Sequence, residues 1–279
     1  TSRRRKQGGG LHGDPEYLRL HTKRAESKRH DALKEGDHMG LFEFVKNGVR
    51  QMMIARPENM HHLIVYKHPD RSVPMWTQLT VKSDEGAVFF RDGQLMGIVG
   101  PGRHTIDGQN IPFLKNWIDS ATGGNVLLAE IFFVRSQPLN NSPVKFGAKL
   151  GGMIDPGTEL SCSPRIFGEF VVQVTDPVKF ILGLTGQSIQ PHDNDEILEY
   201  ASKLFRKGCR SVIPATISAK NESVLNISAL HDDLEDAFKA RVPDLEDVGL
   251  KVTKMLDFKV NLDPAEQKDL RDAWNMVGM

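Results

Sequence analysis

Two cysteines carry the most reactive side chains of this sequence. Cys162 lies in a Ser-Cys-Ser-Pro stretch. One hypothesis is that its thiol is the nucleophile of a hydrolase, but no histidine that would act as its base lies near it in the sequence. Cys209 falls on an apolar stripe with helical spacing, where a cysteine behaves as a small hydrophobic side chain. Two cysteines are too few for a disulfide framework or a cysteine-based zinc site, and they fit a reducing cytoplasmic location.

Four histidines would be metal ligands only if their spacing brought them together. None of them forms a His-x-x-x-His pair, and none has a carboxylate at a spacing typical of a metal site. The four are His61, His62, His68 and His104. We expect these side chains to be solvated or to lie in a core. No metal or cofactor is therefore predicted.

The glycine-rich stretch Gly97–Gly102 invites comparison with phosphate-binding loops. Its spacing matches neither the dinucleotide-binding loop nor the P-loop, it lacks a Gly-Lys-Ser/Thr ending, and it lies between two predicted strands. We interpret it as a turn whose glycines accept positive φ. Every catalytic pattern thus has a simpler structural explanation, and no enzyme activity is predicted.

Two oppositely charged helix faces provide another candidate site. Basic residues lie opposite the apolar face of one predicted helix, and acidic residues lie opposite the apolar face of the next. Both are explained as solvated faces, because exposed ion pairs contribute little stability. The alternative is a contact between copies, in which one helix pairs with the other helix of a neighbour through Lys203, Arg206, Arg210, Asp232, Asp233 and Asp236.

Composition limits the class of protein. The 279 residues are 39% hydrophobic and hold 36 basic and 36 acidic side chains, so the net charge predicts no nucleic-acid partner. Residues 1–40 hold ten basic and six acidic residues, a net of +4, which leaves 26 basic and 30 acidic residues, a net of −4, in 41–279. We expect 1–40 to be a basic, flexible tail. No run of about 18 apolar residues is present, so no transmembrane helix is predicted.

The segment 41–59 is predicted to be an amphipathic helix, because its apolar residues within 41–55 recur at helical spacing. One interpretation is that this helix docks onto the protein's own sheet. The other is that it lies on an anionic membrane surface, where Arg56 also meets lipid, with contacts from Leu41, Phe42, Val45, Lys46, Val49, Arg50 and Met53.

The remaining sequence predicts an α+β fold: a small β-rich subdomain over 60–148, an α/β subdomain over 149–262 and the start of a C-terminal helix over 263–279. Strands are predicted at 63–66, 77–81, 87–91, 95–99, 126–134, 170–174 and 252–262, and helices at 195–212 and 224–242. Asp92-Gly93 predicts a hairpin, and Asp263-Pro264 predicts a helix start. In the last strand, Leu256 is predicted to share one face with Val252 and Phe258, a face that Lys254 interrupts.

Three sequence segments in this order resemble the SPFH (stomatin/prohibitin/flotillin/HflK-C) domain family. They are Glu85–Gly93 followed by Gly100–Thr105, then Gly168–Pro177, then Leu245–Pro264. Three further segments are similar to a soluble bacterial branch of that family described as virion-core-like: Met39–Phe42, Gln78–Val81 and Asn110–Leu114. The resemblance covers roughly residues 40–279.

The resemblance implies a non-enzymatic, oligomeric scaffold that organises protein partners on the inner, cytoplasmic face of the cell membrane. The partners it implies are further copies of the chain, an anionic membrane surface, and other membrane or stress-response proteins, with no nucleic acid. The virion-core-like label implies an alternative, a soluble shell- or ring-forming assembly protein that needs no membrane.

Overall fold

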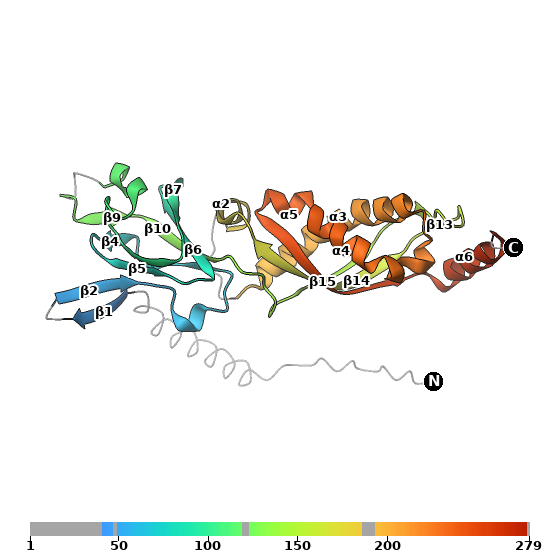
Figure 1. The fold of residues 1–279 in the computed structure, drawn as a ribbon, viewed down its shortest axis with the longest axis horizontal. Coiled ribbons are helices and arrows are strands. Elements are labelled where there is room, and N and C mark those ends of the chain that lie inside the picture. The colour runs from blue at the N-terminus through green and yellow to red at the C-terminus, as the bar shows by residue number, and fades with distance from the viewer. Residues whose placement is uncertain (1–40, 47–48, 119–122, 186–192, 278–279) are drawn as a thin grey trace, which may run out of the picture.

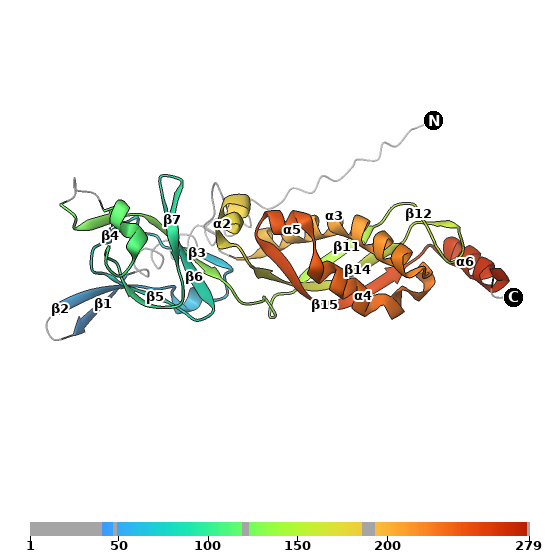
Figure 2. The same ribbon diagram turned by 45° about the horizontal axis from the view of Figure 1, so that its top comes forward.

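The computed structural model describes residues 41–46, 49–118, 123–185 and 193–277, and the predicted tail over 1–40 lies outside them. Figure 1 shows an elongated molecule with a β-rich part at one end and an α/β part at the other. Figure 2 shows the same arrangement after a turn of 45°. The predicted α+β fold is confirmed.

The β-rich part is built from two four-stranded sheets. The first has the strand order β1–β2–β5–β8, with β2 and β5 parallel: β1 (Leu41–Lys46), β2 (Val49–Ile54), β5 (Gln78–Val81) and β8 (Gly102–Thr105). The second has the order β3–β10–β6–β7: β3 (Val65–Lys67), β10 (Glu130–Arg135), β6 (Glu85–Arg91) and β7 (Gln94–Val99). Smaller elements complete this part: β4 (Ser72–Pro74), β9 (Val126–Leu128) and the short helices η1 (Glu58–Met60) and η2 (Pro112–Asn116).

The predicted helix over 41–59 is wrong. Strands β1 and β2 pair antiparallel, with Phe42 opposite Met53 and Val45 opposite Arg50. The sequence between them is Asn47-Gly48, and an Asn-Gly pair between two apolar runs favours a two-residue hairpin over a continuous helix. In the rest of the segment the only helical residues are the first two of η1, which ends at Met60.

The central strands of the β3–β10–β6–β7 sheet, β10 and β6, are buried on both faces. Phe89, Ile131 and Phe133 pack into the core of the β-rich part. Their neighbours Val88 and Phe132 belong to a second core, which continues into the α/β part. Burial on both faces explains why β6 is a continuous apolar run rather than an alternating one.

The α/β part contains a three-stranded antiparallel sheet in the order β11–β14–β15: β11 (Val144–Lys149), β14 (Arg165–Val174) and β15 (Leu250–Asn261). A small ribbon, β12 (Met153–Ile154) with β13 (Ser161–Cys162), lies at the end nearer the C-terminus. The helical elements are α2 (Pro177–Phe180), the π-helix η4 (Ile181–Thr185), α3 (Asp195–Lys220), the 3-10 helix η5 (Val224–Leu230), α4 (His231–Ala240), α5 (Pro243–Asp247) and α6 (Pro264–Val277).

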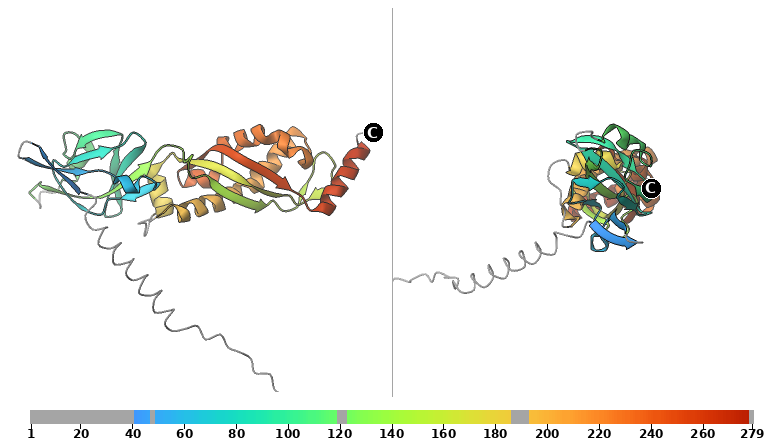
Figure 3. Two further views of the ribbon diagram at one scale, coloured as in Figure 1. Left: turned by 90° about the horizontal axis from the view of Figure 1, so that it is seen from below. Right: turned by 90° about the vertical axis from the view of Figure 1, so that its left-hand side faces the viewer.

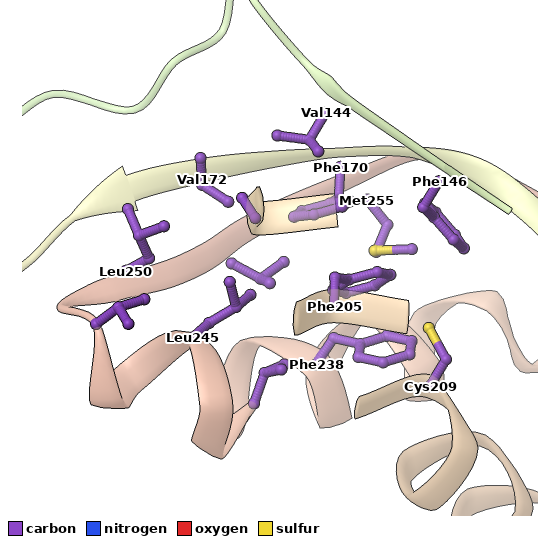
Figure 4. Close-up of a cluster of buried hydrophobic side chains, with 14 of the residues drawn as sticks. Val144, Phe146, Phe170, Val172, Phe205, Cys209, Phe238, Leu245, Leu250 and Met255 are labelled. Carbon is purple, nitrogen blue, oxygen red and sulfur yellow. The ribbon is translucent and has the colours of Figure 1, made fainter. Parts of the chain in front are cut away.

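A group of phenylalanine rings joins the sheet to α3 and α4 (Figure 4). Phe205 of α3 lies at its centre, with ring centroids 3.9 Å from Phe170, 4.7 Å from Phe146 and 4.7 Å from Phe238. Helices α3, α4 and α5 pack on this face of the sheet, and in the left view of Figure 3 the strands lie in front of the helices. In the described part of the chain, the opposite face carries the exposed residues of β11 and β15.

The predicted face of the last strand is wrong at one position. Met255 is 3% exposed and lies in the core, whereas Leu256 is 42% exposed. The pairing of β14 with β15 shifts register between Glu169 and Phe170 and again between Val171 and Val172. Each β-bulge adds a residue to one strand, so strict alternation assigns the residues beyond it to the wrong face.

Two predicted helices have different bounds in the structure. Helix α3 continues past residue 212 to Lys220 and contains Pro214. The predicted helix over 224–242 is divided into η5 and α4, with Ser223 accepting a hydrogen bond from the backbone N–H of Leu225 at the start of η5. The predicted start of the last helix is confirmed: the backbone N–H of Ala265 donates to Asp263 Oδ1 over 3.0 Å.

Candidate functional site

The seven residues predicted to contact a membrane lie on the β1–β2 hairpin instead of on one helix. Leu41, Phe42, Val45 and Lys46 belong to β1, and Val49, Arg50 and Met53 belong to β2. The hairpin lies at the end of the molecule opposite α6 (Figures 1 and 3). It remains a candidate contact surface because it combines apolar residues with two basic ones at an extremity.

Arg56 was also expected to meet lipid, and this expectation is wrong. Its side chain is fully buried, and its Nε lies 2.8 Å from Glu85 Oε2 in a buried ion pair. Nη1 donates to the carbonyl oxygen of Leu63 over 2.8 Å, and Nη2 donates to that of Phe133 over 2.5 Å. Burial lowers the pKa of Arg56, and the Glu85 carboxylate acts in the opposite direction. Arg56 therefore ties the chain after β2 to the second sheet.

The six residues predicted to join neighbouring copies lie on α3 and α4, which pack side by side on the same face of the sheet. Two of them form ion pairs within the chain: Lys203 with Glu199 at 2.8 Å, and Asp233 with Lys220 at 2.6 Å. In the described part of the chain no ion pair is formed by the other four, Arg206, Arg210, Asp232 and Asp236. The acidic helix thus meets the basic one inside a single copy, and the predicted contact stays a prediction.

Cys162 lies on β13 and is 1% exposed. Burial, with smaller contributions from Asp155 and Glu266, raises the pKa of this thiol to about 11. Cys209 is completely buried on α3, and burial raises its pKa as well. The interpretation of Cys209 as a small core side chain is confirmed.

Both thiols should consequently resist alkylation in the folded protein. A pKa of about 11 leaves only about one Cys162 in 10,000 as thiolate at pH 7. We expect iodoacetamide to modify neither cysteine in buffer and both in 6 M guanidinium chloride, as read by mass spectrometry of the peptides. Rapid modification of Cys162 in the native protein would revive the nucleophile hypothesis.

The four histidines do not gather into one group in the described part of the chain. His68 is fully buried, neither ring nitrogen has a hydrogen-bond partner in the described part of the chain, and burial lowers its pKa. His61 Nε2 lies 2.5 Å from Lys82 Nζ, and His104 Nε2 lies 3.0 Å from the carbonyl oxygen of Gly100. Within the described ranges, no three His, Cys, Asp or Glu side chains are arranged to hold a metal ion.

The glycine-rich stretch forms a turn between strands, as predicted. β7 ends at Val99, β8 begins at Gly102, and Gly102 has a φ of +134°, which L-amino acids with side chains rarely adopt. Neither flanking element is a helix, so the stretch does not present a helix N-terminus to a phosphate.

Asp155 is a buried polar residue that the sequence did not single out. It is fully buried and accepts hydrogen bonds from the backbone N–H of Val224 over 2.6 Å and from Thr158 Oγ1 over 2.8 Å. These bonds fasten the β12–β13 segment to the start of η5, which is a structural role. The only sequence signal was Asp-Pro-Gly, which is typical of a turn.

The sequence matches the model of a known protein family. The family model described as the SPFH domain-Band 7 family matches residues 65–276, which is more than half of the chain. No curated protein matches the sequence. Among the described residues, no helix is both long and apolar enough to cross a bilayer.

Proposed function

Because the chain belongs to the SPFH domain-Band 7 family, we propose that it is a non-enzymatic scaffold that self-associates and holds partner proteins at the cytoplasmic face of a membrane. Family members are in general membrane-associated, scaffold-type proteins without enzymatic activity. The family match over residues 65–276 is the observation that carries this proposal.

The membrane contact is assigned to the β1–β2 hairpin. Its sequence contains apolar residues in both strands and the basic residues Lys46 and Arg50, which in this proposal meet anionic headgroups. One short hairpin is a weak anchor, so stable attachment requires several hairpins in one assembly. Self-association and membrane binding therefore depend on each other in this proposal.

Vesicle co-sedimentation tests the membrane contact. We expect the wild-type chain to sediment with vesicles containing phosphatidylserine, and the double variant Phe42→Glu/Val45→Glu to bind at least about tenfold more weakly, since each apolar residue lost from the boundary costs about 1.5–3 kcal/mol. The matched control is Ile154→Glu/Met276→Glu, which replaces two exposed apolar residues (70% and 76% exposed) nearer the C-terminal end. Equal binding by the hairpin variant and the wild type would refute this contact.

The alternative proposal is a soluble shell- or ring-forming assembly protein that needs no membrane. Electron microscopy of the wild-type chain in buffer, with and without vesicles, separates the two. Closed rings or shells without lipid, together with no binding to vesicles, would favour the alternative. Particles that gather only on vesicles would favour the scaffold on a membrane.

A further inference from the structure

The open face of the β11–β14–β15 sheet is strongly basic. Strand pairing places Lys149 beside Arg165 and Lys145 beside Glu169, and it places Lys259 opposite Phe167 and Asp257 opposite Glu169. Further along, Lys254 stands opposite Val171 and Lys251 opposite Gln173. We call this set the basic sheet face: six basic residues (Lys145, Lys149, Arg165, Lys251, Lys254 and Lys259) against two acidic ones (Glu169 and Asp257), a net of +4.

The centre of the basic sheet face is apolar. Phe167 is 37% exposed, and its neighbour on β11 is Gly147, which has no side chain to cover the ring. Glu169 and Asp257 lie in the next row, paired with Lys145 at 3.8 Å and Lys259 at 2.9 Å. An exposed aromatic ring surrounded by charged side chains is the arrangement typical of a protein–protein contact.

On the opposite side of the α/β part, α4 and α5 form an acidic strip next to the basic residues of α3. The segment 231–249, which holds α4 and α5, contains seven acidic residues and two basic ones, a net of −5. Asp232 and Asp236 are exposed on α4, turned away from the buried Leu234 and Phe238. We call the exposed residues Asp232, Asp236, Glu246 and Asp247, together with Lys239 and Arg241, the acidic helix surface.

We propose that the basic sheet face of one copy binds the acidic helix surface of the next copy. This inference rests on the self-association in the proposed function and names the two surfaces that carry it. The surfaces lie on opposite sides of the same subdomain, with the phenylalanine core between them, so the contact is heterologous. Repetition of such a contact generates a ring or an open filament.

A second copy fits this face better than an anionic bilayer does. Glu169 and Asp257 lie within the basic sheet face, and a uniformly negative surface repels both carboxylates. The acidic helix surface carries Lys239 and Arg241 among its carboxylates, so it can match both signs of charge. The chain is neutral overall, with 36 basic and 36 acidic residues, so unlike faces attract without general repulsion between copies.

Charge reversal on each surface tests the contact by sedimentation velocity of the full chain. The sheet variant is Lys149→Glu/Arg165→Glu/Lys254→Glu, three exposed residues without an ion pair in the described part of the chain. The helix variant is Asp232→Lys/Asp236→Lys. We expect each variant alone to self-associate at least about tenfold more weakly, because like charges then face one another.

Mixing the two variants gives the decisive measurement. In the mixture, the reversed sheet face meets the reversed helix surface of the other variant, and the unchanged faces also match, so assembly should return to near the wild-type level. The matched control for the sheet variant is Arg103→Glu/Lys115→Glu/Lys268→Glu, which changes the net charge by the same amount as the sheet variant does, at exposed positions outside both surfaces. It should assemble like the wild type.

Each of the remaining outcomes of these experiments contradicts at least one of the two proposals. If the wild-type chain stays monomeric at all concentrations, self-association and this inference both fail. If the wild type assembles and the sheet variant assembles equally well, this inference fails while the proposed function stands. If the sheet variant assembles normally but no longer binds phosphatidylserine vesicles, the face is a lipid contact and the inference is wrong. If the control loses assembly as strongly as the sheet variant, the contact is not at this face.

Discussion

Replacing Arg56 by methionine is expected to lower the free energy of unfolding by about 3–5 kcal/mol, because it leaves the buried Glu85 carboxylate without its positive partner, with the backbone N–H of Lys82 still donating to it. Both side chains of this pair are at most 1% exposed, so water cannot compensate for the missing guanidinium. The carbonyl oxygens of Leu63 and Phe133 also lose their donors. Urea unfolding followed by circular dichroism measures the loss.

The double variant Arg56→Met/Glu85→Leu distinguishes an unpaired charge from a packing defect. Removing both charges should recover most of the stability, since buried ion pairs are often replaced by apolar residues at little cost. Its stability should remain below that of the wild type, because the carbonyl oxygens of Leu63 and Phe133 have lost the hydrogen bonds from the guanidinium. A single variant Arg56→Met as stable as the wild type would show that this pair is not buried in solution.

Replacing Phe205 by alanine is expected to cost about 3–5 kcal/mol, the range for truncating a large core aromatic residue. Its ring is fully buried and contacts the rings of Phe146, Phe170 and Phe238, which come from both the sheet and α4. Few neighbours can close the resulting cavity, because these rings are held by separate elements. Thermal unfolding by calorimetry provides the measurement.

Phe205→Leu is the matched control, since it keeps most of the apolar volume and removes only the aromatic contacts. We expect a smaller loss, of about 1–2 kcal/mol, from the ring pairs and the imperfect fit. Equal losses for Phe205→Ala and Phe205→Leu would mean that ring contacts, and not cavity formation, dominate at this position.

Local chemistry made part of the fold predictable from the sequence. Asp92-Gly93 predicted a hairpin, and both residues have positive φ, at +49° and +79°, as the type I′ turn requires. Asp263-Pro264 predicted the start of α6, where the aspartate accepts the backbone hydrogen bond expected of an N-cap. These signals succeed because the interactions lie within a few residues of one another.

The hairpin of β1 and β2 was missed although a similar signal was present. Its apolar residues also fit a helical period over fifteen residues, and this period outweighed the Asn47-Gly48 pair between the two runs. A short apolar segment fits both periods, so the turn residues have to decide between them. The tertiary neighbour of β2, the parallel strand β5, is 24 residues away and gives no local signal.

The burial of polar residues could not be predicted from the sequence either. Arg56 looks like a surface residue because charged side chains are rarely buried, and its partner Glu85 lies in a different sheet. The basic sheet face is assembled from alternate positions of three strands that span residues 144–261, and two bulges shift the register between them. Only the pairing of the strands brings those lysines and that arginine together.

The sheet shared by both cores makes the described molecule one mechanical body. Val88 and Phe132 face one core while Phe89 and Phe133 face the other, and Asn194 at the start of α3 bonds to the backbone of Ile64 and His62. A load applied at the β1–β2 hairpin is therefore transmitted towards α6 through side-chain packing, not through a flexible tether. In the proposed assembly, the tilt of each copy at one end would fix the spacing of the other ends, so the shape of a single chain and the contact between copies would together set the curvature.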